Sequence, residues 1–155
     1  MKPPLKPTSK PTWNRSEGRA ALLRVYQQAD RILEPWTCEK SADCCHFTRT
    51  GREPSVTIGE WNEIVRAVRA SGRKLPGPPS DGERTCPFLV DGRCSIYESR
   101  PLGCRTYFCH RITGPGDPPR GELSALVAPL RSLAATLDPR DPAPRTLSSW
   151  LKSGG

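Results

Sequence analysis

Seven cysteines are the residues of this chain whose type and spacing could do chemistry. The first group lies in CEKSADCCH and contains Cys38, Cys44 and Cys45. The second group lies in CPFLVDGRCSIYESRPLGCRTYFCH and contains Cys86, Cys94, Cys104 and Cys109. Because seven is an odd number, these cysteines cannot all pair in internal disulfides, and clustered thiols in a reducing compartment are more often metal ligands or redox groups. All seven are therefore candidate metal ligands.

The spacing of the thiols bears on which metal they would bind. The chain has no C-x2-C pair, so the usual spacing of a zinc finger or zinc ribbon is absent. Thiolates bind both zinc and iron–sulfur clusters, and the larger core of a [4Fe–4S] cluster accepts ligands from separate loops. The expected cofactor is an iron–sulfur cluster (4Fe-4S) or zinc, with the cluster favoured. Adjacent Cys44 and Cys45 would point in opposite directions in extended backbone, so that one binds the metal while the other packs or binds a second ion.

A β-hairpin is predicted where Asp91 and Gly92 separate the apolar segments CPFLV and RCSIY. With a two-residue turn, Cys94 would stand opposite Leu89, and Cys86 would face the other side of the ribbon. With a three-residue loop that ends at Gly92, the two cysteines would share a face. A metal bound by both therefore predicts the longer loop or a bulge.

These segments resemble the YkgJ-type cysteine-cluster family, which is described as a zinc- or iron-chelating CxxCxxCC domain. The resemblance rests on the adjacent cysteine pair, on CPFLVDGRCSIY and on RPLGCR, and it covers residues 38–109. It implies six metal ligands by position, namely Cys38, Cys44, Cys45, Cys86, Cys94 and Cys104.

One position departs from the family pattern. The family motif would place a cysteine at position 41, where this chain has Ser41. Since serine is a poor ligand for soft metals, the site is either one thiolate short or completed by another residue. Cys109 is the favoured replacement, ahead of His46 and His110, each of which directly follows a cysteine.

Several residues around the cysteines have expected supporting roles. Arg100 and Arg105 accompany the RPLGCR segment and could offset the charge of a four-thiolate site, which is roughly −2 with either metal centre. We favour that role over contact with a substrate. Tyr97 and Phe88 are expected to pack the hairpin, and Trp36 is expected to shield the site from water.

Amphipathic helices flank the cysteine segments. Residues 16–34 carry apolar side chains at helical spacing, which predicts a helix that Ser16 caps and the following proline ends. Residues 58–71 predict a second helix, for which Thr57 and Glu60 form a capping box.

The C-terminal third continues this pattern. A regular apolar stripe over 121–137 predicts a helix with a kink or restart at Pro129. The segment RTLSSWLKSGG predicts a short docked helix through Trp150 and Leu151. The predicted fold class is mainly α with a short β-hairpin, in a small cysteine-rich metal-binding domain flanked by amphipathic helices.

Three regions follow from these patterns. Residues 1–14 read as a flexible, basic, proline-rich tail, 15–137 as a single helical metal-chelating domain, and 138–155 as a C-terminal tail with the docked helix. The cysteine cluster occupies 38–109 of the middle region.

Composition narrows the class of protein. Only 28 of 155 residues are Leu, Ile, Val or Phe, whereas 31 are Pro or Gly, and a metal would compensate for so small an apolar core. No apolar stretch approaches the roughly 18 residues that cross a bilayer, and no leader-like apolar run follows the basic start, so we expect a cytoplasmic protein. The net charge is +8, and Arg66, Arg69 and Arg73 are interpreted as a solvated helix face rather than a nucleic-acid contact.

The leading functional hypothesis is a metal-chelating cysteine-cluster protein. The sequence contains no nucleotide-binding, serine-hydrolase or HExxH motif, and no pair of residues is identifiable as a nucleophile and its base. Whether the protein is an enzyme is therefore left open. One alternative is a methylation-associated or redox enzyme, because flagellin lysine methylases are among the similar cluster-binding proteins. A second alternative is a zinc-dependent nucleic-acid-binding module.

Overall fold

The computed structural model describes residues 15–38, 42–82, 84–107 and 112–154. The expected N-terminal tail, Ser41, Cys109 and His110 lie outside the described residues. The elements in chain order are α1 (Arg15–Leu33), η1 (Asp43–Cys45), α2 (Phe47–Thr50), β1 (Ser55–Val56), α3 (Ile58–Ala70), β2 (Leu89–Val90), β3 (Arg93–Cys94), η2 (Tyr97–Ser99), α4 (Leu102–Arg105), α5 (Arg120–Ser124), α6 (Val127–Leu137), β4 (Arg145–Thr146) and α7 (Leu147–Ser153).

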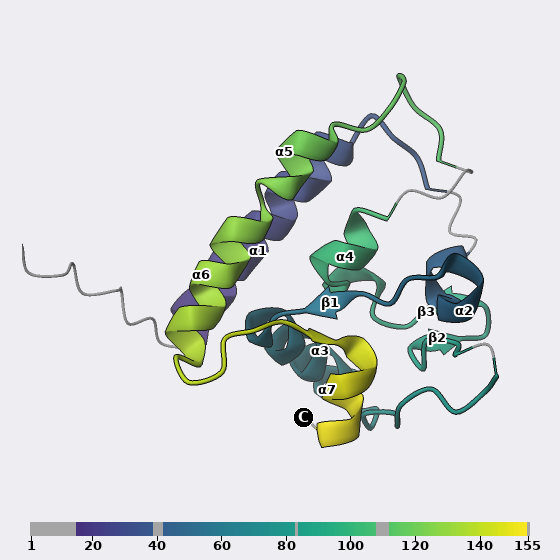
Figure 1. Ribbon diagram of the computed structural model, residues 1–155, viewed down its shortest axis with the longest axis vertical. Helices are drawn as coiled ribbons and strands as arrows, with labels where there is room; N and C mark the ends of the chain where they lie inside the picture. The colour runs from purple at the N-terminus through teal and green to yellow at the C-terminus, as the bar shows by residue number, and fades with distance from the viewer. Residues whose placement is uncertain (1–14, 39–41, 83, 108–111, 155) are drawn as a thin grey trace, which may run out of the picture.

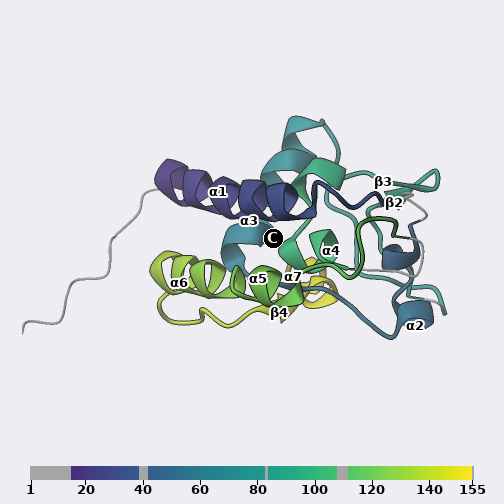
Figure 2. The same cartoon turned by 90° about the horizontal axis from the view of Figure 1, so that it is seen from above.

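Two long helical segments form one layer of the molecule (Figure 1 and Figure 2). α1 runs beside α6 in the opposite chain direction, and α5 adjoins the N-terminal end of α6. The apolar stripes of these helices meet inside the layer, where Leu102 of α4 joins them. The other buried residues of this cluster are Leu22, Val25, Tyr26, Ala29, Leu123, Leu126, Leu130 and Leu133. Burial of one apolar face gives each helix most of its stability, because helices of this length are marginal alone.

The helix N-termini follow local hydrogen bonding, with one correction. α3 begins after Thr57, whose backbone N–H donates to Glu60 Oε2 at 2.9 Å, so the predicted capping box is present. α1 begins at Arg15, and Ser16 therefore lies in the first turn and is not the N-cap that we expected. A serine is tolerated there because the first N–H groups of a helix have no intrahelical partner.

The predicted restart in the third apolar stripe is present, but it precedes the proline. α5 ends at Ser124 and α6 begins at Val127. Pro129 is thus the third residue of α6. In that first turn its missing N–H removes no hydrogen bond within α6.

A second core lies between α3 and α7. The rings of Trp61 and Trp150 stack with centroids 5.6 Å apart, and Trp150 Nε1 donates to the carbonyl oxygen of Val56 at 2.8 Å. β1 pairs antiparallel with β4, with Ser55 opposite Thr146. The C-terminal segment is therefore attached through both a strand and a helix.

α4 stands between the long-helix layer and the part of the molecule that holds α2 and the β2–β3 hairpin (Figure 1). Within the described residues the β structure consists of two two-stranded antiparallel pairs, β1–β4 and β2–β3. The fold is mainly α with a short β-hairpin, as predicted. No described helix combines the length and apolarity needed to cross a membrane.

Candidate metal centre

Every cysteine within the described residues lines one cavity of about 850 Å³. These cysteines come from the end of the α1 segment, from η1, from the loop before β2, from β3 and from α4. Cys38 is exposed, whereas the other five are half-buried or buried: Cys44, Cys45, Cys86, Cys94 and Cys104. The fold thus brings together six of the seven predicted ligands, and the seventh lies outside the described residues.

The adjacent cysteines of η1 both reach the cavity, which corrects the expectation from extended backbone. Ala42 has a left-handed φ of 64° and opens the turn, and the N–H of Cys45 donates to the carbonyl oxygen of Ala42 at 2.9 Å. In a 3-10 turn, successive side chains are about 120° apart rather than opposed. The thiols of Cys44 and Cys45 are close enough to hydrogen-bond to each other.

Backbone hydrogen bonds join the two cysteine groups of the sequence. His46 and Thr85 form an antiparallel bridge. Beside it, the N–H of Cys86 donates to the carbonyl oxygen of Cys45 at 2.6 Å. His46 is half-buried and is not among the described residues that line the cavity, so its part in the site is this backbone pairing.

The hairpin has the shorter of the two predicted turns. Leu89 pairs with Cys94 across a two-residue turn in which Asp91 and Gly92 both have positive φ, at 51° and 74°. Cys86 and Cys94 nevertheless line the same cavity. The N–H of Leu89 donates to the carbonyl oxygen of Cys86 and bends the chain before the ribbon begins, so both cysteines line the cavity without the longer loop. That a metal bound by both requires the longer loop or a bulge stays a prediction.

Cys104 lies on α4, which is held by a buried carboxylate. Glu60 of α3 accepts from the backbone N–H of Leu102 at 2.7 Å, at the first residue of α4. Arg105 extends from the end of α4 to Asp30 of α1, with 3.0 Å between Nη1 and Oδ1. These contacts fix both ends of the helix that presents Cys104.

Four of the thiols, those of Cys44, Cys45, Cys94 and Cys104, hold their protons tightly in the absence of a metal. Hydrogen bonding with Cys45, together with burial, raises the pKa of Cys44 far above its usual range. The hydrogen bond from Cys44 lowers the pKa of Cys45, but the contact with Cys86 and burial outweigh it and raise that pKa to about 12. Burial raises the pKa of Cys104 and of Cys94. A bound metal would therefore have to replace protons that are present at neutral pH.

Arg100 supplies positive charge beside the thiols. Its guanidinium lies over the ring of Tyr97, 3.8 Å from the centroid, and its Nε donates to the carbonyl oxygen of Tyr97 at 2.8 Å. The charge of Arg100 opposes the raised pKa values of Cys44, Cys94 and Cys104 without reversing them. Tyr97 thus holds Arg100 against the site as well as lining the cavity.

Arg105 also lines the cavity, but its guanidinium is engaged by the protein itself. Besides the ion pair with Asp30, it donates to the carbonyl oxygens of Arg100 and Glu98, and it lies 4.1 Å from the centroid of the Tyr26 ring. Its side chain is only 5% exposed. Arg105 therefore fastens α4 to α1, and Arg100 is the arginine whose charge acts on the thiols.

Trp36 and Cys38 lie on the cavity wall at the end of the α1 segment. Thr37 pairs with Thr113 in an antiparallel bridge, and Trp36 Nε1 donates to the carbonyl oxygen of Gly116 at 3.0 Å. This places the indole of Trp36 in the cavity lining, where we expected it to limit access of water. Phe88, by contrast, is fully buried in the core behind the thiols.

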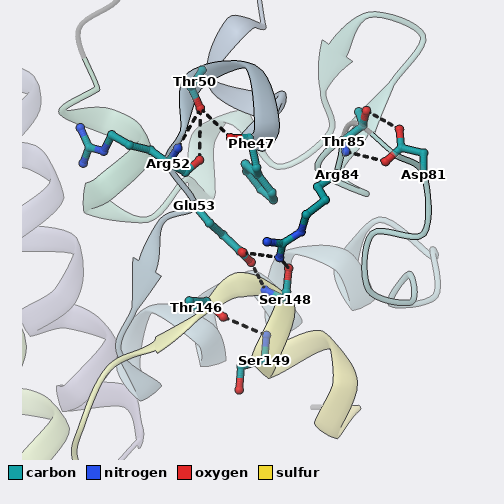
Figure 3. Close-up of polar contacts among 10 residues, drawn as sticks. All are labelled: Phe47, Thr50, Arg52, Glu53, Asp81, Arg84, Thr85, Thr146, Ser148 and Ser149. Carbon is teal, nitrogen blue, oxygen red and sulfur yellow. Dashed lines mark hydrogen bonds and ion pairs between the residues drawn. The ribbon is translucent and has the colours of Figure 1, made fainter.

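A polar network that the sequence did not reveal ties the cysteine loops to the C-terminal helix (Figure 3). Glu53 accepts from the guanidinium of Arg84 at 2.7 Å and from the backbone N–H of Ser148 at 2.5 Å. Arg84 directly precedes the bridge that leads to Cys86, and Leu147 of α7 lines the cysteine cavity. Glu53 carries no local signal for this role, because its partners are 31 and 95 residues away in the sequence.

The thiols line a cavity without closing around a single point. Among the described residues, no group of three or more His, Cys, Asp or Glu side chains is arranged to hold a metal ion. Protonated thiols that hydrogen-bond to one another are not yet in a ligand geometry, since coordination requires the thiolate. What the arrangement offers is a set of sulfur donors, together with Arg100, around a volume much larger than one ion.

Comparison with known families gives this arrangement a context. A family model for CxxCxxCC, a family of candidate zinc- or iron-chelating domains, matches residues 37–119, which is more than half of the chain. The chain belongs to the CxxCxxCC family. The matched part of this CxxCxxCC protein contains all seven cysteines, whereas α1 and α7 lie outside it. Searches of curated proteins and of solved structures found no match.

Proposed function

We propose that this CxxCxxCC protein holds a [4Fe–4S] cluster, in preference to a zinc ion, through four of the thiolates that line its cavity. The observation that carries the proposal is that every described cysteine, from five segments of chain, lines the same cavity. A cluster accepts ligands that are spread over such a volume, whereas one zinc ion needs four donors within about 2.3 Å of a single point.

The electrostatic contacts among the thiols suggest which of them are ligands. Cys44 acts on the titration of Cys94, and both Cys44 and Cys94 act on the titration of Cys104. Cys45 acts on Cys104 and hydrogen-bonds to Cys44, so it is the proposed fourth ligand. Cys86, which contacts Cys45, and Cys38 are the reserve ligands, and Cys109 stays a candidate.

The surroundings of the cavity fit such a centre. Four thiolates and a 2+ core carry a formal charge of about −2, which Arg100 is placed to offset. Phe47 and Leu147 supply buried apolar wall, and Trp36 covers part of it. When bound, an iron–sulfur cluster supplies one-electron transfer or a structural cross-link among these segments.

Metal analysis and visible spectroscopy of the anaerobically purified chain test the proposal. We expect about four iron atoms per chain and a broad band near about 400 nm that bleaches on reduction. A colourless protein that contains one zinc ion per chain would mean that these thiols bind zinc and not a cluster. A chain that acquires neither metal under anaerobic reconstitution would contradict metal chelation.

A reducing compartment such as the cytoplasm suits this proposal, because it keeps the thiols available for the metal. No observation on the described residues favours the two alternative functions. Arg66, one of the arginines that could meet nucleic acid, donates instead to Glu63 at 2.6 Å.

A further inference from the structure

We propose that the protein has a second ligand site, distinct from the cysteine cavity, that binds a small phosphorylated molecule. The site is a cavity of about 410 Å³. It shares α4 with the cysteine cavity as a common wall: Leu102 and Gly103 line the second cavity, and Cys104 and Arg105 line the first. A volume of this size is within the range of small-molecule sites, which is about 300–1,000 Å³.

Three arginines from separate segments line the second cavity. Arg52 follows α2, Arg120 is the first residue of α5, and Arg131 lies in α6. Glu53 and Glu60 line the same cavity and would be the obvious partners for these guanidinium groups. Whether positive charge remains for a ligand therefore depends on what the two carboxylates already bind.

Both carboxylates are engaged by other groups. Glu60 accepts from the backbone N–H groups of Leu102 and Thr57, at 2.7 and 2.9 Å. Glu53 accepts from Arg84 and from the N–H of Ser148 (Figure 3). In the described contacts neither carboxylate hydrogen-bonds to Arg52 or Arg131.

The guanidinium groups of Arg52 and Arg131 are correspondingly available. That of Arg52 lies 5.5 Å from the centroid of the Tyr107 ring, a contact that leaves its N–H edge free to donate. Among the described contacts, Arg131 forms no hydrogen bond or ion pair through its side chain. Ser55 and Ser124 add hydroxyl groups to the lining.

This combination favours a phosphate group over a single carboxylate. A phosphate monoester carries about −1.5 to −2 charges at neutral pH and three acceptor oxygens, so it can accept from two arginines and a hydroxyl together. Arginine presents a planar fork of donors that matches these oxygens. A monocarboxylate would neutralise only one of the guanidinium groups.

Equilibrium dialysis of the metal-loaded full chain against radiolabelled inorganic phosphate tests this site. We expect saturable binding of one phosphate per chain, and competition by glycerol 3-phosphate. Arg52→Gln and Arg131→Gln should each weaken binding about tenfold, as expected for loss of a charged hydrogen bond. Arg69→Gln, at an exposed position of α3 away from the cavity, is the matched control and should bind as the wild type does.

Three outcomes would overturn the proposal. One is uptake of phosphate that does not saturate, and another is an equal loss of binding in Arg69→Gln, since both would indicate general attraction to a basic protein. The third is competition by acetate as strong as that by glycerol 3-phosphate, which would show that the site does not select phosphate. Metal content measured on the same samples shows whether the cysteine cavity is intact, so failure of one site is distinguishable from failure of the other.

Discussion

Cys86 donates its backbone N–H to the carbonyl oxygen of Cys45 at 2.6 Å, and this bond joins the two cysteine groups of the sequence. It is made by the main chain, beside the bridge between His46 and Thr85. Substitution of either thiol therefore leaves the bond in place. The cavity is assembled by backbone pairing as well as by any metal, which makes single-cysteine variants informative about ligation.

Cys104→Ser should lose metal and stability together. Three other thiols, those of Cys44, Cys45 and Cys94, act on the titration of Cys104. The energy of metal binding contributes to folding when ligands come from separate segments. We expect a loss of at least about 3 kcal/mol, or roughly 10 °C in Tm for a chain of this size. Metal analysis and a thermal melt measure the two effects.

Cys38→Ser is the matched variant, because Cys38 lines the same cavity but is exposed. It should retain most of the metal and melt within a few degrees of the wild type. If Cys38→Ser loses the metal and Cys104→Ser keeps it, the proposed ligand set is wrong.

Arg100→Gln should release the metal faster. The variant removes the positive charge that lies beside Cys44, Cys94 and Cys104. Residues that contact the ligands of a metal, and not the metal itself, commonly contribute 10- to 100-fold to metal affinity. We expect the rate of metal transfer to a chelator to rise about tenfold. Arg93→Gln is the control, because Arg93 is exposed and also lines the cavity. Equal rates in the two variants would assign Arg100 no special role.

Gly114→Ala should open the cavity wall at Trp36. A Cβ on residue 114 would lie 2.3 Å from Cδ1 of the Trp36 ring, so the indole must move and lose its hydrogen bond to Gly116. We expect faster metal loss to a chelator. Gly77→Ala places its Cβ in open space and should leave the rate unchanged.

Glu53→Ala should loosen the C-terminal helix. The variant leaves the N–H of Ser148 and the guanidinium of Arg84 without their acceptor, which costs about 2 kcal/mol for partly buried groups. Hydrogen exchange at the amides of α7 should accelerate more than exchange in α1. Asp141→Asn removes an exposed ion pair with Arg145 and should change little. If neither variant exchanged the amides of α7 faster than those of α1, Glu53 would not be the residue that holds α7 in place.

Glu63→Gln should remove a contribution to the free energy of unfolding that depends on pH. Burial raises the pKa of Glu63, but hydrogen bonds and charges from Arg66 and Arg19 outweigh burial and hold it below its usual value. A carboxylate with a lowered pKa stabilises the fold above its unfolded pKa of about 4.3, and this contribution is lost as the pH falls through the folded pKa. Because both arginines are half exposed, we expect only about 1 kcal/mol.

Urea unfolding at a series of pH values measures this contribution of Glu63 to the free energy of unfolding. The difference between wild type and Glu63→Gln should be largest near neutrality and shrink towards zero at acid pH. Asn62→Ala, at an exposed position of α3, removes no titratable group and should show a difference that does not vary with pH. A wild-type advantage that grows as the pH falls would reverse the assigned sign.

Local signals in the sequence predicted the longer helices and the β2–β3 hairpin. Apolar spacing predicted α1 and α3, and the Asp91-Gly92 pair predicted the hairpin, because each of these depends on neighbouring residues. β1 and β4 escaped prediction, since a two-residue strand has no periodicity to detect.

The sequence identified the cysteines that line the cavity but not how the fold brings them there. Chemistry identified the cysteines, yet the shared orientation of Cys44 and Cys45 depends on the left-handed Ala42, and Cys86 reaches the cavity through a turn before β2. The roles of Glu53 and Arg105 depend on contacts between distant segments, which no local pattern encodes.

The cavity wall has a consequence for how this domain can be exchanged between proteins. The family match covers 37–119, but Leu33 of α1 and Leu147 of α7 also line the cysteine cavity. A fusion protein that contained only residues 37–119 would keep the cysteines but lack the residues of α1 and α7 that line their cavity. The complete cavity of this chain therefore needs residues on both sides of the segment that the family model matches.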